Sequence, residues 1–130
     1  MMRSTLIGVL ALTALTTTAA WADGDPAAGE KVFTQCKACH QIGETAKNGV
    51  GPKLNGLFGR HSGSVEGYNY SDANKNSGIT WDETVFREYI KAPRTKIPGT
   101  KMAFAGIKDD QKITDLIAFL KQYDADGKKK

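Results

Sequence analysis

The stretch Cys36-Lys37-Ala38-Cys39-His40 determines how the rest of this 130-residue sequence is interpreted. It has the form C-x-x-C-H, which is the attachment pattern for c-type haem. Two thiols at this spacing can each bond to one vinyl group of the porphyrin, and the histidine that follows can place its imidazole on the iron. The pattern therefore predicts one haem c, bound covalently through Cys36 and Cys39, with His40 as an iron ligand.

A C-x-x-C pair has other uses, and each fits this chain less well. Half of a zinc site would need further ligands, but His61 is the only other histidine. A thioredoxin-like dithiol needs a βαβ context, and the sequence has no alternating strand pattern of useful length. A disulfide between Cys36 and Cys39 is possible but gives His40 no role. We therefore expect haem attachment.

The first 22 residues have the features of a secretory signal peptide. Met1-Met2-Arg3 is a short basic start, residues 6–15 form an apolar run, and Ala20-Trp21-Ala22 is an A-x-A cleavage pattern. The apolar run is shorter than the roughly 20 residues that a membrane anchor needs. We expect export to the periplasm with cleavage after Ala22. Residues 23–130 would then form a single domain of 108 residues, with a net charge of +3 instead of +4 because Arg3 is lost.

Three amphipathic patterns predict helices after residue 22, and no pattern predicts a strand. The first helix begins at Asp25-Pro26, a capping residue followed by a proline that fits the first turn. The second begins at the capping box Thr80-x-x-Glu83 and must end near Ala92, because a proline follows. The third and clearest runs over residues 109–123. The fold class is therefore expected to be all-α.

The segment between the first two helices is long and irregular. Residues 41–79 contain eight glycines and at most one short helix, near residues 71–75. Such a segment is unusual in a small domain, and three modest helices supply limited apolar surface for a core. A large apolar cofactor would organise it, because glycine-rich backbone can approach a flat ring closely. The last residues, Gly127-Lys128-Lys129-Lys130, are expected to be a frayed tail.

The second axial ligand of the iron decides the kind of function. A protein ligand at this position blocks gas binding and peroxide chemistry and leaves electron transfer as the function, whereas an open position suggests one of the first two. The predicted leader carries the other two methionines, so Met102 is the only one in the mature chain, and it lies in a loop that contains proline and glycine. His61 and deprotonated lysines are the competing ligands. We expect His40 and Met102 to be the metal ligands.

Further motifs make the chain resemble the class I c-type cytochromes, close to bacterial cytochromes c2 and mitochondrial cytochromes c. The resemblance runs from about residue 24 to residue 123. It implies the cytochrome c fold, in which helices and glycine-rich loops wrap around one covalently attached haem. Beyond the attachment stretch, its motifs are Gly51-Pro52, Gly56-Leu57-Phe58-Gly59-Arg60, Tyr70-Ser71-Asp72-Ala73-Asn74, Gly78-Ile79-Thr80-Trp81 and Pro98-Gly99-Thr100-Lys101-Met102.

The resemblance also implies roles for residues around the cofactor. The carbonyl of Pro52 would accept a hydrogen bond from the ring N–H of His40 and fix the imidazole. The haem propionates would be bonded or neutralised by Arg60, Tyr70 and Trp81. A polar network beside Met102 would consist of Asn74, Tyr89 and Thr100. The first and last helices would cross at a contact made by Gly29, Phe33, Leu116 and Phe119.

These observations predict a carrier of single electrons that makes and breaks no substrate bonds and is therefore not an enzyme. The resemblance implies a soluble periplasmic shuttle that takes electrons from a cytochrome bc1 complex to a terminal oxidase or a photosynthetic reaction centre. The alternative is a haem enzyme or gas-binding protein with an open or weakly ligated sixth site.

The charge pattern suggests the kind of partner. Lysines beside the attachment motif and the methionine loop would steer the protein to acidic docking surfaces of redox proteins: Lys37, Lys96, Lys101 and Lys108. A net charge of +3, with acidic residues interspersed, disfavours nucleic acid. A monomer without stable membrane insertion is expected.

Overall fold

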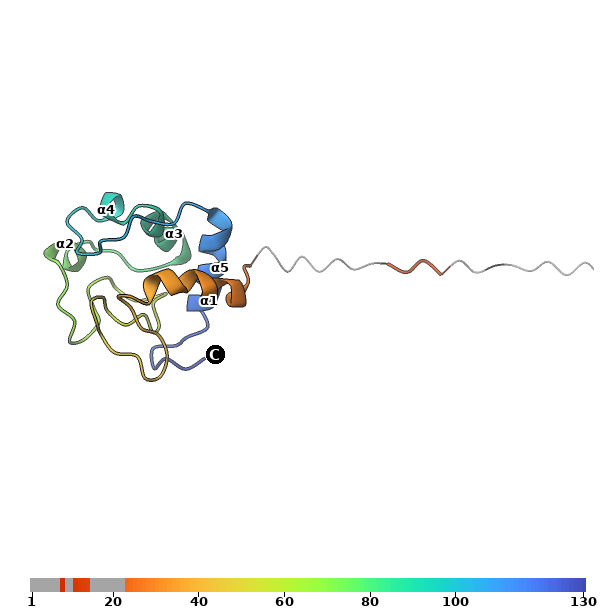
Figure 1. The fold of residues 1–130 in the computed structure, drawn as a ribbon, viewed down its shortest axis with the longest axis horizontal. Coiled ribbons are helices and arrows are strands. Elements are labelled where there is room, and N and C mark those ends of the chain that lie inside the picture. Colours follow the sequence, from red (N-terminus) through yellow and green to blue (C-terminus); the bar gives the residue numbers. More distant parts are fainter. Residues whose placement is uncertain (1–7, 9–10, 15–22) are drawn as a thin grey trace, which may run out of the picture.

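The computed structural model of the protein describes residue 8, residues 11–14 and residues 23–130 (Figure 1). The predicted signal peptide therefore falls almost wholly outside the described residues. In residues 23–130, β structure is limited to two isolated bridges. No helix in the described part of the chain is long and apolar enough to cross a membrane. The helices are α1 (Pro26–Phe33), the 3-10 turn η1 (Thr34–Cys36), α2 (Asp72–Lys75), α3 (Glu83–Lys91), α4 (Pro93–Lys96) and α5 (Asp110–Leu120). The all-α prediction is confirmed.

The beginning of α3 differs from the predicted capping box. The helix starts at Glu83, and Asp82 is its N-cap, because the carboxylate of Asp82 accepts a 2.8 Å hydrogen bond from the backbone N–H of Val85. Thr80 is held elsewhere: it forms an isolated bridge with His61, and its hydroxyl lies 2.8 Å from Nδ1 of that histidine. The capping box was therefore the wrong interpretation, because a long-range pairing occupies the threonine.

Two other helix boundaries also differ from the prediction. Pro93 ends α3 as expected, but it also begins the short helix α4, which the sequence reasoning missed. Proline is suited to that first position, since its absent N–H would have no helical partner there. The last helix ends at Leu120 instead of Tyr123, and Tyr123 belongs to the turn that follows.

Helices α1 and α5 cross at close range, as predicted (Figure 1). Gly29 allows this approach, because a Cβ atom there would overlap the backbone carbonyl of Asp115. The rings of Phe33 and Phe119 pack with centroids 5.1 Å apart. At the start of α1, Asp25 caps the helix as predicted, and its own N–H donates to the carboxylate of Asp115 at 2.9 Å. The crossing brings the two ends of the domain together.

The chain end is folded back, so the prediction of a frayed tail is wrong. Lys130 donates its N–H to the carbonyl of Gln122 at 2.8 Å, and Tyr123 pairs with Lys129 in an isolated bridge. The carboxylate of Asp124 accepts from two N–H groups within the turn. Asp124 therefore stabilises a turn here, whereas the lysine-rich composition had suggested a frayed chain end. Figure 1 shows the C-terminus beside the loops that follow α1.

Candidate functional site

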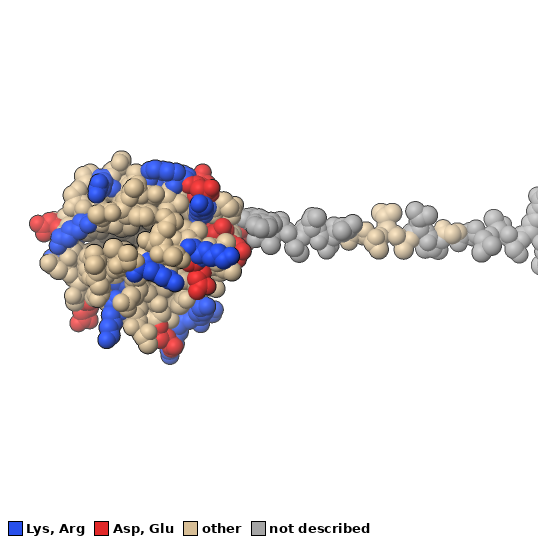
Figure 2. Space-filling view, in the orientation of Figure 1, with Lys and Arg blue, Asp and Glu red and all other residues tan. Residues whose placement is uncertain are grey.

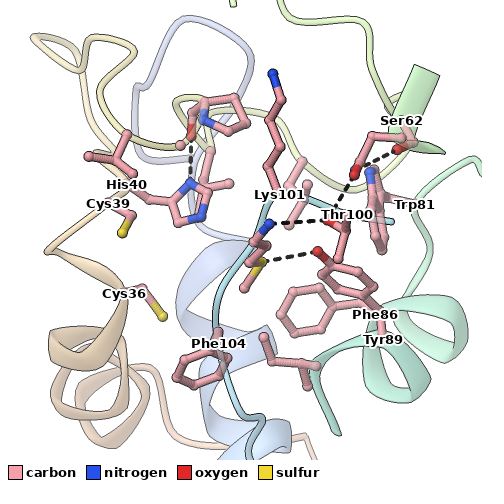
Figure 3. Close-up of a pocket in the computed structure, with 18 of the residues that line it drawn as sticks. Cys36, Cys39, His40, Ser62, Trp81, Phe86, Tyr89, Thr100, Lys101 and Phe104 are labelled. Carbon is pink, nitrogen blue, oxygen red and sulfur yellow. Dashed lines mark hydrogen bonds between the residues drawn. The ribbon is translucent and has the colours of Figure 1, made fainter. Parts of the chain in front are cut away.

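An apolar cavity of about 360 Å³ lies between the attachment motif, the glycine-rich loops, α3 and the methionine loop. Its volume is within the range of about 300–1,000 Å³ that is usual for cofactor sites. Figure 3 shows Cys36, Cys39 and His40 on one side of the site, and Trp81, Phe86 and Tyr89 of the α3 region on the other. Met102 lines the same cavity. The fold thus brings the two predicted attachment cysteines and the two predicted iron ligands to one space.

The ring of His40 is fixed by its neighbours. Its Nδ1 lies 2.7 Å from the carbonyl oxygen of Pro52, and because a carbonyl can only accept, Nδ1 carries the proton. Nε2 is therefore left with the lone pair that a metal needs. A Cβ at position 51 would lie 2.7 Å from Nδ1, so Gly51 is required for the ring to sit there. Burial lowers the pKa of His40, the bond to Pro52 opposes this shift, and Arg60 adds to it, so the ring is neutral at pH 7.

Cys36 and Cys39 are free thiols in the structure and are not joined in a disulfide. Cys36 is half-buried at the end of η1, whereas Cys39 is exposed. Burial, together with the nearby Cys39, raises the pKa of the Cys36 thiol to about 11. Cys36 therefore stays in the neutral thiol form at pH 7, which suits a side chain that faces an apolar space.

A chain of polar contacts surrounds Met102. The hydroxyl of Tyr89 donates to its sulfur at 3.0 Å, and its backbone N–H donates to the hydroxyl of Thr100 at 3.3 Å. Thr100 in turn donates to the side-chain oxygen of Asn74 at 2.9 Å. Burial raises the pKa of Tyr89, with Thr100 opposing the shift, so the phenol keeps its proton. Asn74, Tyr89 and Thr100 thus form one connected network that ends on the thioether.

A cation stands at the polar end of the cavity. Arg60 lines it, and its guanidinium donates at 3.1 Å to the carbonyls of Lys53 and Asn55. Burial lowers the pKa of Arg60, with Tyr70 opposing the shift, and an arginine stays charged at neutral pH. Among the described residues, Arg60 has no carboxylate partner. A half-buried guanidinium without a counter-ion fits an anionic group in the cavity.

The other two residues predicted to bind the propionates line the same space. The hydroxyl oxygen of Tyr70 accepts from the N–H of Val65 at 3.0 Å, which leaves its own proton available as a donor. Burial raises the pKa of Tyr70, so that proton is retained at pH 7. Trp81 is buried and packs edge-on against Tyr89 with centroids 4.9 Å apart. His61, the competing axial ligand, is exposed and does not line the cavity.

Comparison with known proteins agrees with this arrangement. The model of the family described as cytochrome c matches residues 26–124. The chain belongs to the cytochrome c family. It is 64% identical to cytochrome c2 of Blastochloris viridis over 129 residues, which cover 99% of this chain and 100% of the relative. It is also 64% identical to cytochrome c-550 of Nitrobacter winogradskyi over 107 residues, or 82% of this chain and 98% of the relative.

A solved structure shares the fold. Cytochrome cH from Methylobacterium extorquens superposes with a TM-score of 0.72 at 51% identity, and the match covers 76% of this chain and 99% of that one. The predicted resemblance to class I c-type cytochromes and the predicted cytochrome c fold are therefore confirmed. As a cytochrome c, the protein is a haem protein of electron transport.

The residues present in this cytochrome fit a haem c. The family implies a covalently bound haem, and the two cysteines have the spacing that attachment needs. The cavity offers one imidazole nitrogen and one thioether sulfur as iron ligands, and its lining is otherwise mainly apolar. Arg60, which has no carboxylate partner within the part of the chain that the structure describes, would balance the negative charge of the propionates. No group of three or more His, Cys, Asp or Glu side chains within the described residues could hold a bare metal ion.

Some lining residues of this cytochrome escaped the sequence reasoning. Ser62 lies 3.5 Å from the amide of Asn74 and extends the polar network, but no sequence signal marks a single loop serine. Phe86 lies within the predicted second helix, and nothing in the sequence distinguishes it from an ordinary core residue, although it lines the cavity. Phe104 stands two residues after Met102, so an extended backbone there could have suggested that both side chains share a face.

Proposed function

We propose that this cytochrome is a soluble periplasmic carrier of single electrons and not an enzyme. One haem c per chain would be held through Cys36 and Cys39, with His40 and Met102 as axial ligands. The observation that carries the proposal is the shared cavity, in which two thiols, a neutral imidazole and a thioether meet in apolar surroundings. When bound, the haem supplies an iron that alternates between Fe(II) and Fe(III).

The axial side chains favour a raised potential. A thioether is a neutral ligand and favours ferrous iron over ferric iron. Tyr89 supports this, because its hydroxyl donates to the sulfur of Met102 and withdraws electron density from it. The apolar walls act in the same direction, since burial disfavours the additional positive charge of the oxidised centre. Pro52 holds the His40 ring in one orientation, which would present Nε2 to the iron as a fixed ligand.

The polar end of the cavity would hold the propionates. Arg60 supplies the positive charge, and Tyr70 and Trp81 supply an O–H and an N–H donor from the same lining. Two backbone carbonyls hold the guanidinium of Arg60 in place, so its side chain loses little conformational entropy when it binds an anion.

Electrons would enter and leave where the cavity reaches the surface. The exposed residues of its lining mark this rim: Gln35, Ala38, Cys39, Val50, Lys101 and Ala103. Val50 is 76% exposed and offers an apolar contact. Figure 2 shows lysine and arginine side chains spread over the visible face, with acidic side chains mostly towards its margins. Such a rim suits brief docking on acidic surfaces of a bc1 complex, an oxidase or a reaction centre.

The four lysines predicted for docking differ in their surroundings. Lys37 and Lys101 are exposed beside the rim, and Lys101 donates to the carbonyl of Asn69 at 3.2 Å. Lys96 pairs with Glu88 at 2.6 Å, and the ammonium of Lys108 contacts the carbonyl of Lys91. We therefore expect Lys37 and Lys101 to contribute more to docking than the other two.

Periplasmic location rests on the leader. Residues 1–22 carry the export features, and removing them leaves 108 residues. The Nitrobacter winogradskyi relative is matched over 98% of its own length by 107 residues of this chain, which supports a mature protein of that size. A mass spectrum of the purified periplasmic protein tests both points: we expect a chain that begins at Asp23 and carries one haem.

Axial ligation is tested by carbon monoxide binding and by the potential. The reduced wild-type protein should not bind carbon monoxide promptly at neutral pH, because Met102 closes the sixth site. Met102→Ala should open the site, bind carbon monoxide and lower the potential. His61→Ala is the control and should behave as wild type. Prompt binding by the wild type would favour the haem enzyme or gas-binding alternative instead.

Docking is tested by the dependence of partner reduction on salt. The rate with an acidic redox partner should fall as the ionic strength rises, because exposed charges are screened beyond about 10 Å at 0.1 M. Lys37→Ala and Lys101→Ala should each slow association at low salt, whereas Lys112→Ala, on the exposed side of α5, should have less effect. Equal effects of all three variants would show that docking has no preferred side.

A further inference from the structure

We propose that the C-terminal segment, residues 122–130, is a positioning element for the axial histidine. We call this segment the clasp. It packs against Gly43 and Asn55, the two residues that join the ends of the loop that carries Pro52. Asn55 and Gly127 are the residues through which it acts. The inference rests on the proposed function only for its last step, the effect on the haem iron.

The clasp is a folded hairpin with its own hydrogen bonds. Asp124 and Lys128 are joined by a 2.9 Å backbone bond, and Gly127 donates to the carbonyl of Asp124 at 3.0 Å. The ring of Tyr123 packs on Phe119 of α5 with centroids 5.5 Å apart, which anchors the hairpin to the helical core. The ammonium of Lys129 lies over the same ring, 5.8 Å from its centroid. The clasp therefore has a defined place from which to act.

The turn of the clasp meets the loop at close range. A Cβ on Gly127 would overlap the carbonyl of Gly43 and would lie 2.7 Å from the amide nitrogen of Asn55. A Cβ on Gly56 would lie 2.8 Å from the Cα of Ala125. Gly127 also has φ +79°, a conformation that other residues seldom adopt. Only glycine at position 127 allows this turn to reach the loop.

The contacted residues are the ones that close the loop. The buried amide of Asn55 donates to the carbonyl of Gly43 and accepts from its N–H, both at 2.9 Å. This pair of bonds joins the two ends of residues 43–55, and Pro52 lies within that segment. Because the Asn55 side chain is buried, moving the two loop ends apart would break both bonds and leave buried polar groups without partners, which costs free energy.

The loop reaches the histidine over a short distance. The N–H of Gly51 donates to the carbonyl of Cys39 at 2.8 Å, and the carbonyl of Pro52 accepts from Nδ1 of His40 at 2.7 Å. A shift of the loop end therefore changes the geometry of the imidazole bond. A weaker bond makes the imidazole a less basic ligand, which stabilises ferric iron less and raises the potential.

Gly127→Ala tests the clasp in the haem-loaded full chain. We expect the ring Nδ1–H of His40 to exchange with solvent about five- to tenfold faster, as loss of one hydrogen bond's net stabilisation implies, and the potential to rise. Gly78→Ala is the matched control: its φ is +70°, and no atom lies within 4 Å of the added Cβ. Asn55→Ala should reproduce the effect of Gly127→Ala from the loop side.

Backbone amide exchange in α5 separates positioning from general destabilisation. The amides of Ile117 and Leu120 should keep their wild-type rates within about twofold in both variants. Wild-type exchange of the His40 proton in Gly127→Ala and Asn55→Ala would overturn the proposal, and so would an equal acceleration of the α5 amides. If Gly127→Ala does not fold, Asn55→Ala decides alone. A wild-type chain without bound haem would contradict the proposed function instead.

Discussion

The α1–α5 crossing and the loop half, residues 41–79, are stabilised in different ways. At the crossing, apolar side chains interlock directly, and Phe33, Leu116 and Leu120 are almost fully buried. In the loop half, side-chain amides and backbone groups close short loops, as in the bonds of Asn48 to Lys53 and of Asn55 to Gly43. The crossing is held by dispersion and hydrophobic burial, whereas the loops are held by directional polar contacts.

This difference shows how the protein divides its tasks. Close-packed helices give a rigid frame, but a packed core has no space for a cofactor. The loops place apolar and polar groups around a space that their own side chains do not fill, and we expect the haem to complete the core there. Removing the cofactor and removing single packed side chains should therefore affect the two regions unequally.

The largest effect should follow from preventing haem attachment. In the variant Cys36→Ser/Cys39→Ser, residues 41–79 should lose most of their protection from hydrogen exchange, because nothing then fills the cavity that they line. The loss should approach the whole stability of a small domain, about 5–15 kcal/mol. Exchange measured by mass spectrometry checks this, with Ala38→Ser as the control that keeps both thiols. Full protection of the loops in the double variant would show that they fold by themselves.

The stability of the α1–α5 crossing should depend on side-chain packing more than the stability of the loop half does. Phe119→Ala removes the ring that contacts Phe33 and Tyr123 and should cost about 3–5 kcal/mol in the free energy of unfolding. Phe58→Ala removes a half-buried ring from the loop half, which contacts Phe86 with centroids 5.6 Å apart, and should cost about 1–3 kcal/mol. Denaturant unfolding of both variants checks the order. The reverse order would remove the distinction between the two regions.

Acid should weaken the loop half through His40. Burial lowers the pKa of His40 in the folded protein, and an iron bond at Nε2 would exclude the same proton, so below about pH 6.5 the unfolded chain binds a proton that the folded one does not. The free energy of unfolding should therefore fall as the pH drops below about 6.5, by up to about 1.4 kcal/mol per pH unit. Denaturant unfolding from pH 7.5 to 5 checks this. A free energy of unfolding that stayed constant over this range would contradict the prediction.

The smallest effect concerns the start of α3. Asp82→Ala removes the cap and should cost about 1 kcal/mol, within the range of 0.5–2 kcal/mol for lost N-caps. Thr80→Ala should change the stability by no more than about 0.5 kcal/mol, since that side chain is exposed and does not cap the helix. Thermal unfolding compares the two. A larger loss for Thr80→Ala would restore the capping box.

Local patterns predicted much of the molecule. Asp25 before Pro26 and the apolar stripe of α5 rest on interactions between near neighbours in the chain, so the sequence was enough to predict them. The attachment motif is local as well, because its chemistry needs only a fixed spacing. By contrast, Thr80 failed as a cap because a distant partner, His61, holds it. The prediction of a frayed tail failed because Asp124 stabilises the turn and Gly127 packs against Gly43.

Helix periodicity and residue spacing are properties of a continuous segment, so they were enough to predict the all-α class, the attachment motif and the candidate ligands. Long-range packing, by contrast, sets which groups share the cavity, places Arg60 against backbone carbonyls there, and packs the chain end on the loop that carries Pro52. These contacts join residues that are far apart in the chain, and their formation depends on how the helices and loops pack in three dimensions.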